Sequence, residues 1–145
     1  MTKEQIDLVQ ASFSEIVPGA DAAAELFYNR LFEIDPALRP MFKGDLGEQG
    51  RKLMQMLGVA VRGLSRLDEL APSVRSLGER HAGYGVEDRH YETVGTALLW
   101  TLEKGLGTGF TSDVRDAWTA AYTLLARTMQ EGAVAAEADT AALAA

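Results

Sequence analysis

The chain has 145 residues, a hydrophobic fraction of 47%, a net charge of −7 and a sequence pI of about 4.8. This length fits one domain with a sizeable core, and an acidic surface is not attracted to nucleic acid or to membranes. Because there is no cysteine, disulfides, zinc ribbons, thiol nucleophiles and cysteinyl iron–sulfur clusters are excluded. No signal-peptide pattern and no membrane-length apolar run is found, so we expect a cytoplasmic protein.

The first half of the chain has the periodicity of helices separated by short breaks. Apolar residues recur every three or four positions, and no stretch alternates with period two. Thr2 and Gln5 have the form of a capping box for the first helix, which Pro18–Gly19 should end. The helices expected next cover residues 21–34, 37–42 and 47–64, with a polar break at 43–45.

The second half continues the helical pattern. Leu67 and Leu70 are expected in a connector, and Pro72 in the first turn of the following helix. Glycines should end that helix, at Gly83 and Gly85.

Two longer helices should complete the domain. One covers residues 87–106, and the last begins near Thr111 or Ser112. From residue 133 to residue 145 the chain is rich in alanine and poor in large apolar groups, so we expect a frayed helix or a disordered tail there. A single domain should therefore cover residues 1–132.

His81 is the residue most informative about function. Leu70, Val74, Leu77 and His81 are four, three and four residues apart, so they share one helix face. A histidine at such a place can simply be a core-edge residue bonded to a carbonyl, or a charged residue near a helix C-terminus. It can also be an axial haem ligand, with Nε2 on iron and Nδ1–H donating to a carbonyl near Leu77.

His90, the second histidine, serves as a comparison. It lies beside Asp88 and Arg89 in a polar run. We interpret it as a surface or capping residue.

Upstream residues would suit a gas ligand. Tyr28 lies in an apolar segment, either as a core aromatic or as a hydroxyl donor to a bound diatomic. Gln49 is either an exposed polar residue or a second donor, and Phe42 is either a corner aromatic or a ring stacked on a porphyrin. Arg80 is either solvated or a partner of a haem propionate. No phosphate-binding loop, nucleophile elbow or His-x₃-His pair competes with this interpretation.

Over residues 2–131 the chain resembles the bacterial single-domain haemoglobins, which include the Vitreoscilla-type proteins and the globin part of flavohaemoglobins. The resemblance lies in the order and spacing of blocks at residues 26–32, 36–42, 49–53, 77–86, 90–95 and 117–122. It implies an all-α globin fold around a haem pocket, with a short C helix, a polar CD loop and haem b.

The resemblance also implies roles for individual residues. His81 matches the proximal iron ligand, and the distal residues match Tyr28, Gln49 and Leu53. Further contacts to haem are expected from Phe42, Leu57, Leu77, Arg80, Val86, Tyr91 and Val94.

One position departs from the flavohaemoglobin pattern. The glutamate of the last helix that joins the proximal histidine and Tyr91 is matched here by Ala133, and Glu131 lies two residues earlier. Without an acid beside His81, the imidazole pushes less electron density to iron and peroxidase-like O–O cleavage is less favoured.

The expected function is high-affinity, reversible binding of O₂, and of NO and CO, at five-coordinate ferrous haem. Two distal donors predict slow O₂ release, which suits a nitric oxide dioxygenase served by a separate reductase. No flavin or nicotinamide domain is expected in this chain. The alternatives are O₂ delivery or storage, a gas sensor acting through a partner protein, and a haemless helical bundle. We expect a monomer or a weak homodimer.

Overall fold

The structure, a computed structural model, describes the backbone of residues 1–144 and the side chains of residues 1–135. Its regular secondary structure over that range is entirely helical. The α-helices are α1 (Lys3–Ile16), α2 (Ala20–Ile34), α3 (Leu46–Arg62), α4 (Leu67–Gly83), α5 (Asp88–Leu106) and α6 (Ser112–Ala144). Short 3₁₀ segments lie between them, at Val17–Gly19, Pro36–Met41, Gly63–Arg66 and Gly107–Gly109.

Side-chain caps explain where several helices begin. The predicted capping box at Thr2 is confirmed: its hydroxyl accepts from the Gln5 N–H at 3.1 Å, and the Gln5 side chain accepts from the Thr2 N–H at 3.0 Å. The carboxylates of Asp35 and Asp45 accept backbone N–H groups in the same way at the starts of Pro36–Met41 and α3.

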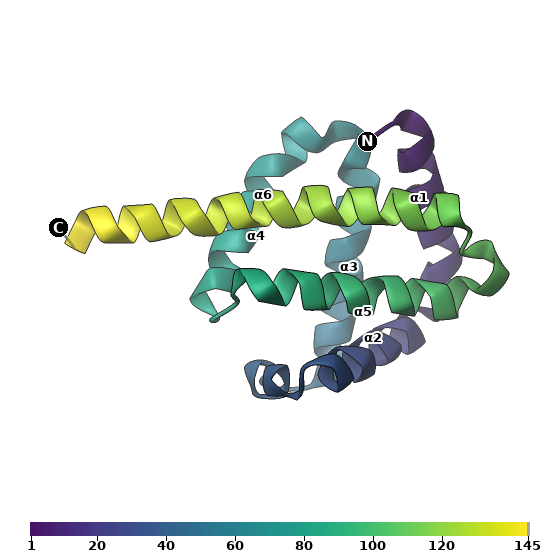
Figure 1. The fold of residues 1–145 in the computed structure, drawn as a ribbon, viewed down its shortest axis with the longest axis horizontal. Coiled ribbons are helices and arrows are strands. Elements are labelled where there is room, and N and C mark those ends of the chain that lie inside the picture. Colours follow the sequence, from purple (N-terminus) through teal and green to yellow (C-terminus); the bar gives the residue numbers. More distant parts are fainter. Residues whose placement is uncertain (145) are drawn as a thin grey trace.

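The helices form two crossing groups. In Figure 1, α5 and α6 run side by side along the length of the molecule, and α1, α3 and α4 cross behind them. α4 packs chiefly against α6, and α2 packs against α3 and α5. The last turns of α6 project beyond the other helices in Figure 1.

The larger core cluster joins α1 to α6. Trp118 of α6 is 2% exposed, and its ring N–H donates to the hydroxyl of Ser12 in α1 at 2.8 Å. Ser12 in turn donates to the Leu8 carbonyl at 2.7 Å, so each polar group in this apolar contact has a partner. Phe13 lies against Trp118 in the same cluster.

The smaller core cluster lies between α2 and α5. Its buried members are Phe27, Tyr28, Leu31, Leu38 and Ala97. It is the part of the core that contains the predicted distal tyrosine.

The connector predicted at residues 67–70 is wrong. Leu67 and Leu70 belong to α4, and Pro72 lies inside that helix rather than in its first turn. The cause is tertiary packing, because the Leu70 side chain lies so close to the backbone of Gly63 that a Cβ there would come within 2.9 Å of it.

The predicted tail at residues 133–145 coincides with the last part of α6. The backbone is helical through Ala144, whereas side chains from residue 136 onward and all of Ala145 lie outside the described residues. The domain boundary at residue 132 stays a prediction. Among the described residues, none of the helices combines the length and apolar character needed to span a bilayer.

Candidate functional site

His81 lies in the last turn of α4, and one of its ring nitrogens is hydrogen-bonded to the backbone. Its Nδ1 is 2.8 Å from the carbonyl oxygen of Leu77, one turn earlier, as the sequence predicted. A carbonyl only accepts, so Nδ1 carries the hydrogen, and in the neutral imidazole the lone pair then lies on Nε2. The half-buried imidazole therefore has its Nε2 on the edge of the ring away from the Leu77 carbonyl.

The loop after α4 is tied to the backbone of the same histidine. The N–H groups of Tyr84 and Val86 both donate to the His81 carbonyl, at 3.0 and 3.1 Å. The Tyr84 ring lies 6.0 Å from the imidazole, centroid to centroid, and is 68% exposed. Gly85 makes the turn with φ at 88°, a conformation that glycine adopts without strain.

Two glycines fix the position of α4 on α6. A Cβ at Gly78 would overlap the carbonyl of Met129, and a Cβ at Gly132 would overlap the carbonyl of Arg75. The two backbones are thus in direct contact, one turn before His81.

Glu131 is engaged beside this crossing. Its carboxylate lies 3.4 Å from Nε of Arg75, at the surface. It is therefore paired with α4's arginine rather than with His81.

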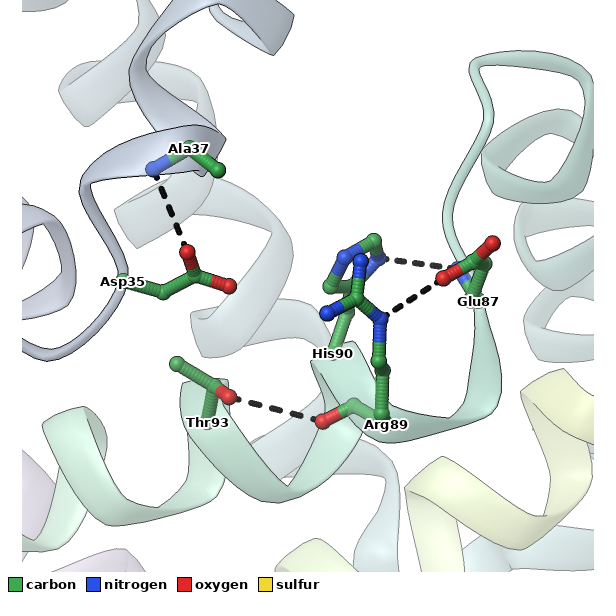
Figure 2. A network of polar contacts seen from close by, with 6 residues as sticks. All are labelled: Asp35, Ala37, Glu87, Arg89, His90 and Thr93. Carbon is green, nitrogen blue, oxygen red and sulfur yellow. Dashed lines mark hydrogen bonds and ion pairs between the residues drawn. The ribbon is translucent and has the colours of Figure 1, made fainter.

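His90 caps α5. Its Nδ1 accepts the Glu87 N–H at 2.9 Å, while Glu87 pairs with Arg89 at 2.7 Å, as Figure 2 shows. The capping role predicted for His90 is confirmed, but a surface position is wrong, because the residue is 6% exposed. The neighbouring Arg89 guanidinium also holds the pKa of the Glu87 carboxyl below its usual range. The cap anchors the far end of the loop that begins at Tyr84.

Tyr28 lies in an aromatic cluster on α2. It is 6% exposed, and its ring contacts Phe27, Phe32 and Phe42 with centroids 5.4, 6.1 and 5.3 Å away. Burial raises the pKa of its phenol, so the hydroxyl keeps its hydrogen at neutral pH. Phe42 thus packs against the predicted distal tyrosine.

Gln49 points toward the loop before α3. Its side-chain N–H₂ donates to the Lys43 carbonyl, at the polar break that the sequence predicted. Leu53, one turn later, packs with Phe42 and Val94 against the cluster around Tyr28. The structure therefore brings Tyr28, Phe42, Leu53 and Val94 together, while the Gln49 amide is bonded elsewhere.

The remaining predicted contacts are distributed around these. Leu57 packs against the larger core cluster between α1 and α6 instead of the one around Tyr28. Leu77 and Val86 are half-buried next to His81, and Arg80 is exposed. Tyr91 is half-buried, and burial raises the pKa of its phenol.

The sequence did not predict the contact that Tyr122 makes, nor the close approach at the glycines of the crossing. The Tyr122 hydroxyl donates to the Tyr91 carbonyl at 2.6 Å, and a Cβ at Gly95 would come within 2.8 Å of its ring. Glycines inside helices, such as Gly78 and Gly95, are the available signal, because a helical glycine usually marks a close approach.

Comparison with known proteins decides the family. The family model for Globin matches residues 25–129. The chain belongs to the globin family. The fold is therefore the globin fold, and the family implies a haem cofactor and gaseous ligands.

Several relatives are similar over nearly the whole globin chain. A flavohemoprotein of Vibrio cholerae is 29% identical over 92% of this chain, and the match covers 35% of that protein. Neuroglobin-1 of Oncorhynchus mykiss is 27% identical over 91% of this chain and 92% of its own length. This globin thus spans about a third of the flavohemoprotein and almost all of the neuroglobin.

Two solved structures have the same fold. An engineered carbene transferase, made from a candidate nitric oxide dioxygenase of Rhodothermus marinus, superposes with a TM-score of 0.84 at 26% identity, over 100% of this chain and 99% of that one. A bacterial globin of Campylobacter jejuni gives 0.80 at 25% identity, over 91% of this chain and 96% of that one. These likenesses support a bacterial globin related to the flavohaemoglobin type.

The residues present fit a haem better than a bare metal ion. No group of three or more histidine, cysteine, aspartate or glutamate side chains within residues 1–135 could hold an ion. A porphyrin brings four nitrogen ligands of its own, so a single side-chain nitrogen such as Nε2 of His81 would suffice as the protein's contribution. Apolar side chains on α3 are partly exposed, including Leu53 and Met56, as needed for contact with a flat apolar group.

Proposed function

We propose that this globin binds haem b through Nε2 of His81 and takes up O₂ and other diatomic gases with high affinity. The observation that carries the proposal is the hydrogen bond from Nδ1 of His81 to the Leu77 carbonyl at 2.8 Å. It fixes the tautomer that can coordinate iron, and it orients the ring. The two bonds from Tyr84 and Val86 to the His81 backbone hold the end of α4 around it.

Haem supplies a ferrous iron that binds diatomic gases reversibly. The polypeptide determines how long a gas stays. Tyr28 is the proposed donor to the gas, because its phenol is buried, retains its proton and has its ring held by Phe27 and Phe42. A hydrogen bond to a group that carries charge contributes about 1.5–3 kcal/mol, which favours slow release.

Gln49 is the proposed second distal donor, and this role requires a movement. Its amide must leave the Lys43 carbonyl before it can reach a gas. In the arrangement described here, Tyr28 is therefore the only one of the two proposed to donate a hydrogen bond to the gas. Leu53, packed beside Phe42, provides the apolar surroundings that keep water from competing for the phenol.

The surroundings of His81 favour gas binding over peroxidase chemistry. Within residues 1–135, the acid nearest in sequence to the expected position on α6 is Glu131, and it pairs with Arg75. The His81 imidazole then has a neutral carbonyl as its Nδ1 partner, and it is a weaker electron donor than an imidazole bonded to a carboxylate.

Nitric oxide dioxygenation is the enzymatic activity that we propose. The likeness to a flavohemoprotein and to the engineered Rhodothermus marinus protein supports it. The reaction joins NO, O₂ and one electron into nitrate, so a separate reductase would supply the electron. We place the protein in the cytoplasm, in keeping with its lack of cysteine. We also propose that it is a monomer or a weak homodimer.

Two measurements test this proposal. Purified protein should take up haemin and give a Soret band that shifts when CO is added to the reduced form. The O₂-loaded protein should then consume NO, once without a reductase and repeatedly with one. If NO is consumed once and no reductase restores the activity, O₂ delivery or storage would be the favoured function. Absence of a CO-sensitive band would favour a haemless bundle.

A further inference from the structure

Among the four tyrosines, Tyr84 differs in combining exposure with proximity to His81. It is 68% exposed, whereas Tyr28 is 6% exposed and the other two are half-buried. Its ring lies 6.0 Å from the imidazole, which is within the range of aromatic rings in contact. An electron leaving this phenol therefore has a short path to the proposed iron ligand.

We propose that Tyr84 is a site of oxidative modification, at which peroxide couples two copies of this globin through a dityrosine bond. The inference rests on haem binding by His81, as proposed above. It concerns a stoichiometric self-oxidation and not peroxidase turnover, which the pairing of Glu131 with Arg75 does not favour.

The chemistry balances with hydrogen peroxide as the oxidant. Two Tyr84 phenols, one from each copy, each give up one electron and one proton. One hydrogen peroxide molecule accepts both electrons and both protons. Its O–O bond breaks, which yields two water molecules. A carbon–carbon bond then forms between the two rings, at the carbon next to each phenol oxygen. The ring C–H bond at each joined carbon breaks, and its hydrogen moves to the oxygen, which restores both phenols. A haem held by His81 would provide the path for these electrons.

The surroundings of Tyr84 permit each of these events. The exposed phenol can release its proton to water, whereas the hydroxyl of Tyr122 is committed to the Tyr91 carbonyl. Nothing lies within 4 Å of a Cβ built at Gly83 or at Gly85, so a second ring can approach the loop.

The two tryptophans are the competing electron donors, and both are less suited. Trp118 is 2% exposed and bonded to Ser12. Trp100 is half-buried, and the cations of Arg30 and Lys104 lie 5.2 and 5.7 Å from the centre of its ring. Nearby positive charge disfavours the loss of an electron from that ring.

The test treats haemin-loaded protein with hydrogen peroxide. We expect dityrosine fluorescence and a covalent dimer under denaturing conditions. We also expect two copies of the peptide 81–89 joined to each other, with a mass two hydrogen atoms below the sum of the two. Tyr84→Phe should lose all three signals, and Trp100→Phe should keep them. Because each copy carries a net charge of −7, added salt should raise the yield of dimer.

Four outcomes separate this inference from the proposed function. Protein without haemin should not cross-link, and cross-linking without haemin would overturn the inference. A normal Soret band with unmodified Tyr84, or dimers that persist in Tyr84→Phe, would overturn it while leaving haem binding intact. Failure to bind haemin would contradict the proposed function itself.

Discussion

Gly78 of α4 lies directly against the carbonyl of Met129 in α6, with no room for a side chain between the two backbones. His81 follows one turn later on the same helix. The crossing of α4 and α6 therefore determines where the proposed iron ligand stands relative to the rest of the globin.

Adding one methyl group at this crossing should displace the histidine. Gly78→Ala would overlap Met129 backbone that cannot rotate away, so we expect a loss of about 1–3 kcal/mol in unfolding free energy and faster loss of haem. Gly83→Ala is the matched control, because nothing lies within 4 Å of a Cβ there. Urea unfolding and haem transfer to an acceptor protein measure both effects. Equal behaviour of the two variants would show that α4 has another position open to it.

The phenol of Tyr28 should determine how long O₂ stays bound. Tyr28→Phe removes the hydroxyl and keeps the ring packed on Phe27 and Phe42, so the fold should be unaffected. We expect O₂ to dissociate up to about 100-fold faster, if the hydrogen bond contributes the upper value of about 3 kcal/mol. Stopped-flow displacement of O₂ by CO measures the rate, and an unchanged rate would mean that the phenol does not reach the gas.

Gln49 should matter less than Tyr28 while its amide remains on the Lys43 carbonyl. Gln49→Leu should therefore increase the O₂ dissociation rate by a smaller factor than Tyr28→Phe. The double variant shows whether the two side chains act on the same gas, because independent residues give additive free-energy changes. A larger effect at Gln49 than at Tyr28 would indicate that the amide has turned into the pocket.

The cap at His90 should tolerate one substitution and not another. Glutamine commonly occupies this third helical position of a capping box, so His90→Gln can still accept the Glu87 N–H. His90→Ala cannot, and we expect it to lower the free energy of unfolding by about 1 kcal/mol. Urea denaturation of the two variants gives the comparison, and equal stability would show that the imidazole nitrogen contributes nothing.

Stability should decline in alkaline solution. Burial, and secondarily Tyr91, raises the pKa of Tyr122, and burial alone raises that of Tyr28, from an ordinary value of 10.0. Above pH 10.0 the unfolded chain releases phenol protons that the folded globin keeps, so the free energy of unfolding falls as pH rises. Each such group contributes at most about 1.4 kcal/mol per pH unit. Tyr122→Phe should show a shallower decline, and an identical slope in both proteins would contradict this assignment.

Much of this molecule could be predicted from local sequence because the signals are local. The capping box at Thr2 needs only two residues three apart, and the bond from His81 to Leu77 follows from the spacing of one helical turn. The aromatic cluster around Tyr28 was partly visible as an apolar run in α2.

The features that were missed depend on contacts between distant segments. Leu70 joins α4 because Gly63 leaves room for its side chain. Neither residue on its own indicates this contact in the sequence. His90 looked exposed beside two charged residues, but α5 turns its ring inward while Arg89 pairs with Glu87 at the surface. The direction of the Gln49 side chain depends on a loop carbonyl, which no periodicity reveals.

The most direct test of the account replaces the proposed iron ligand by a cavity. His81→Gly removes the imidazole and leaves Tyr28 on the other side of the proposed haem site untouched. We predict that this variant binds haemin weakly, and that added imidazole restores the Soret band and CO binding of the unsubstituted protein. Full haemin retention and normal CO binding by His81→Gly without imidazole would contradict the assignment of His81 as the ligand.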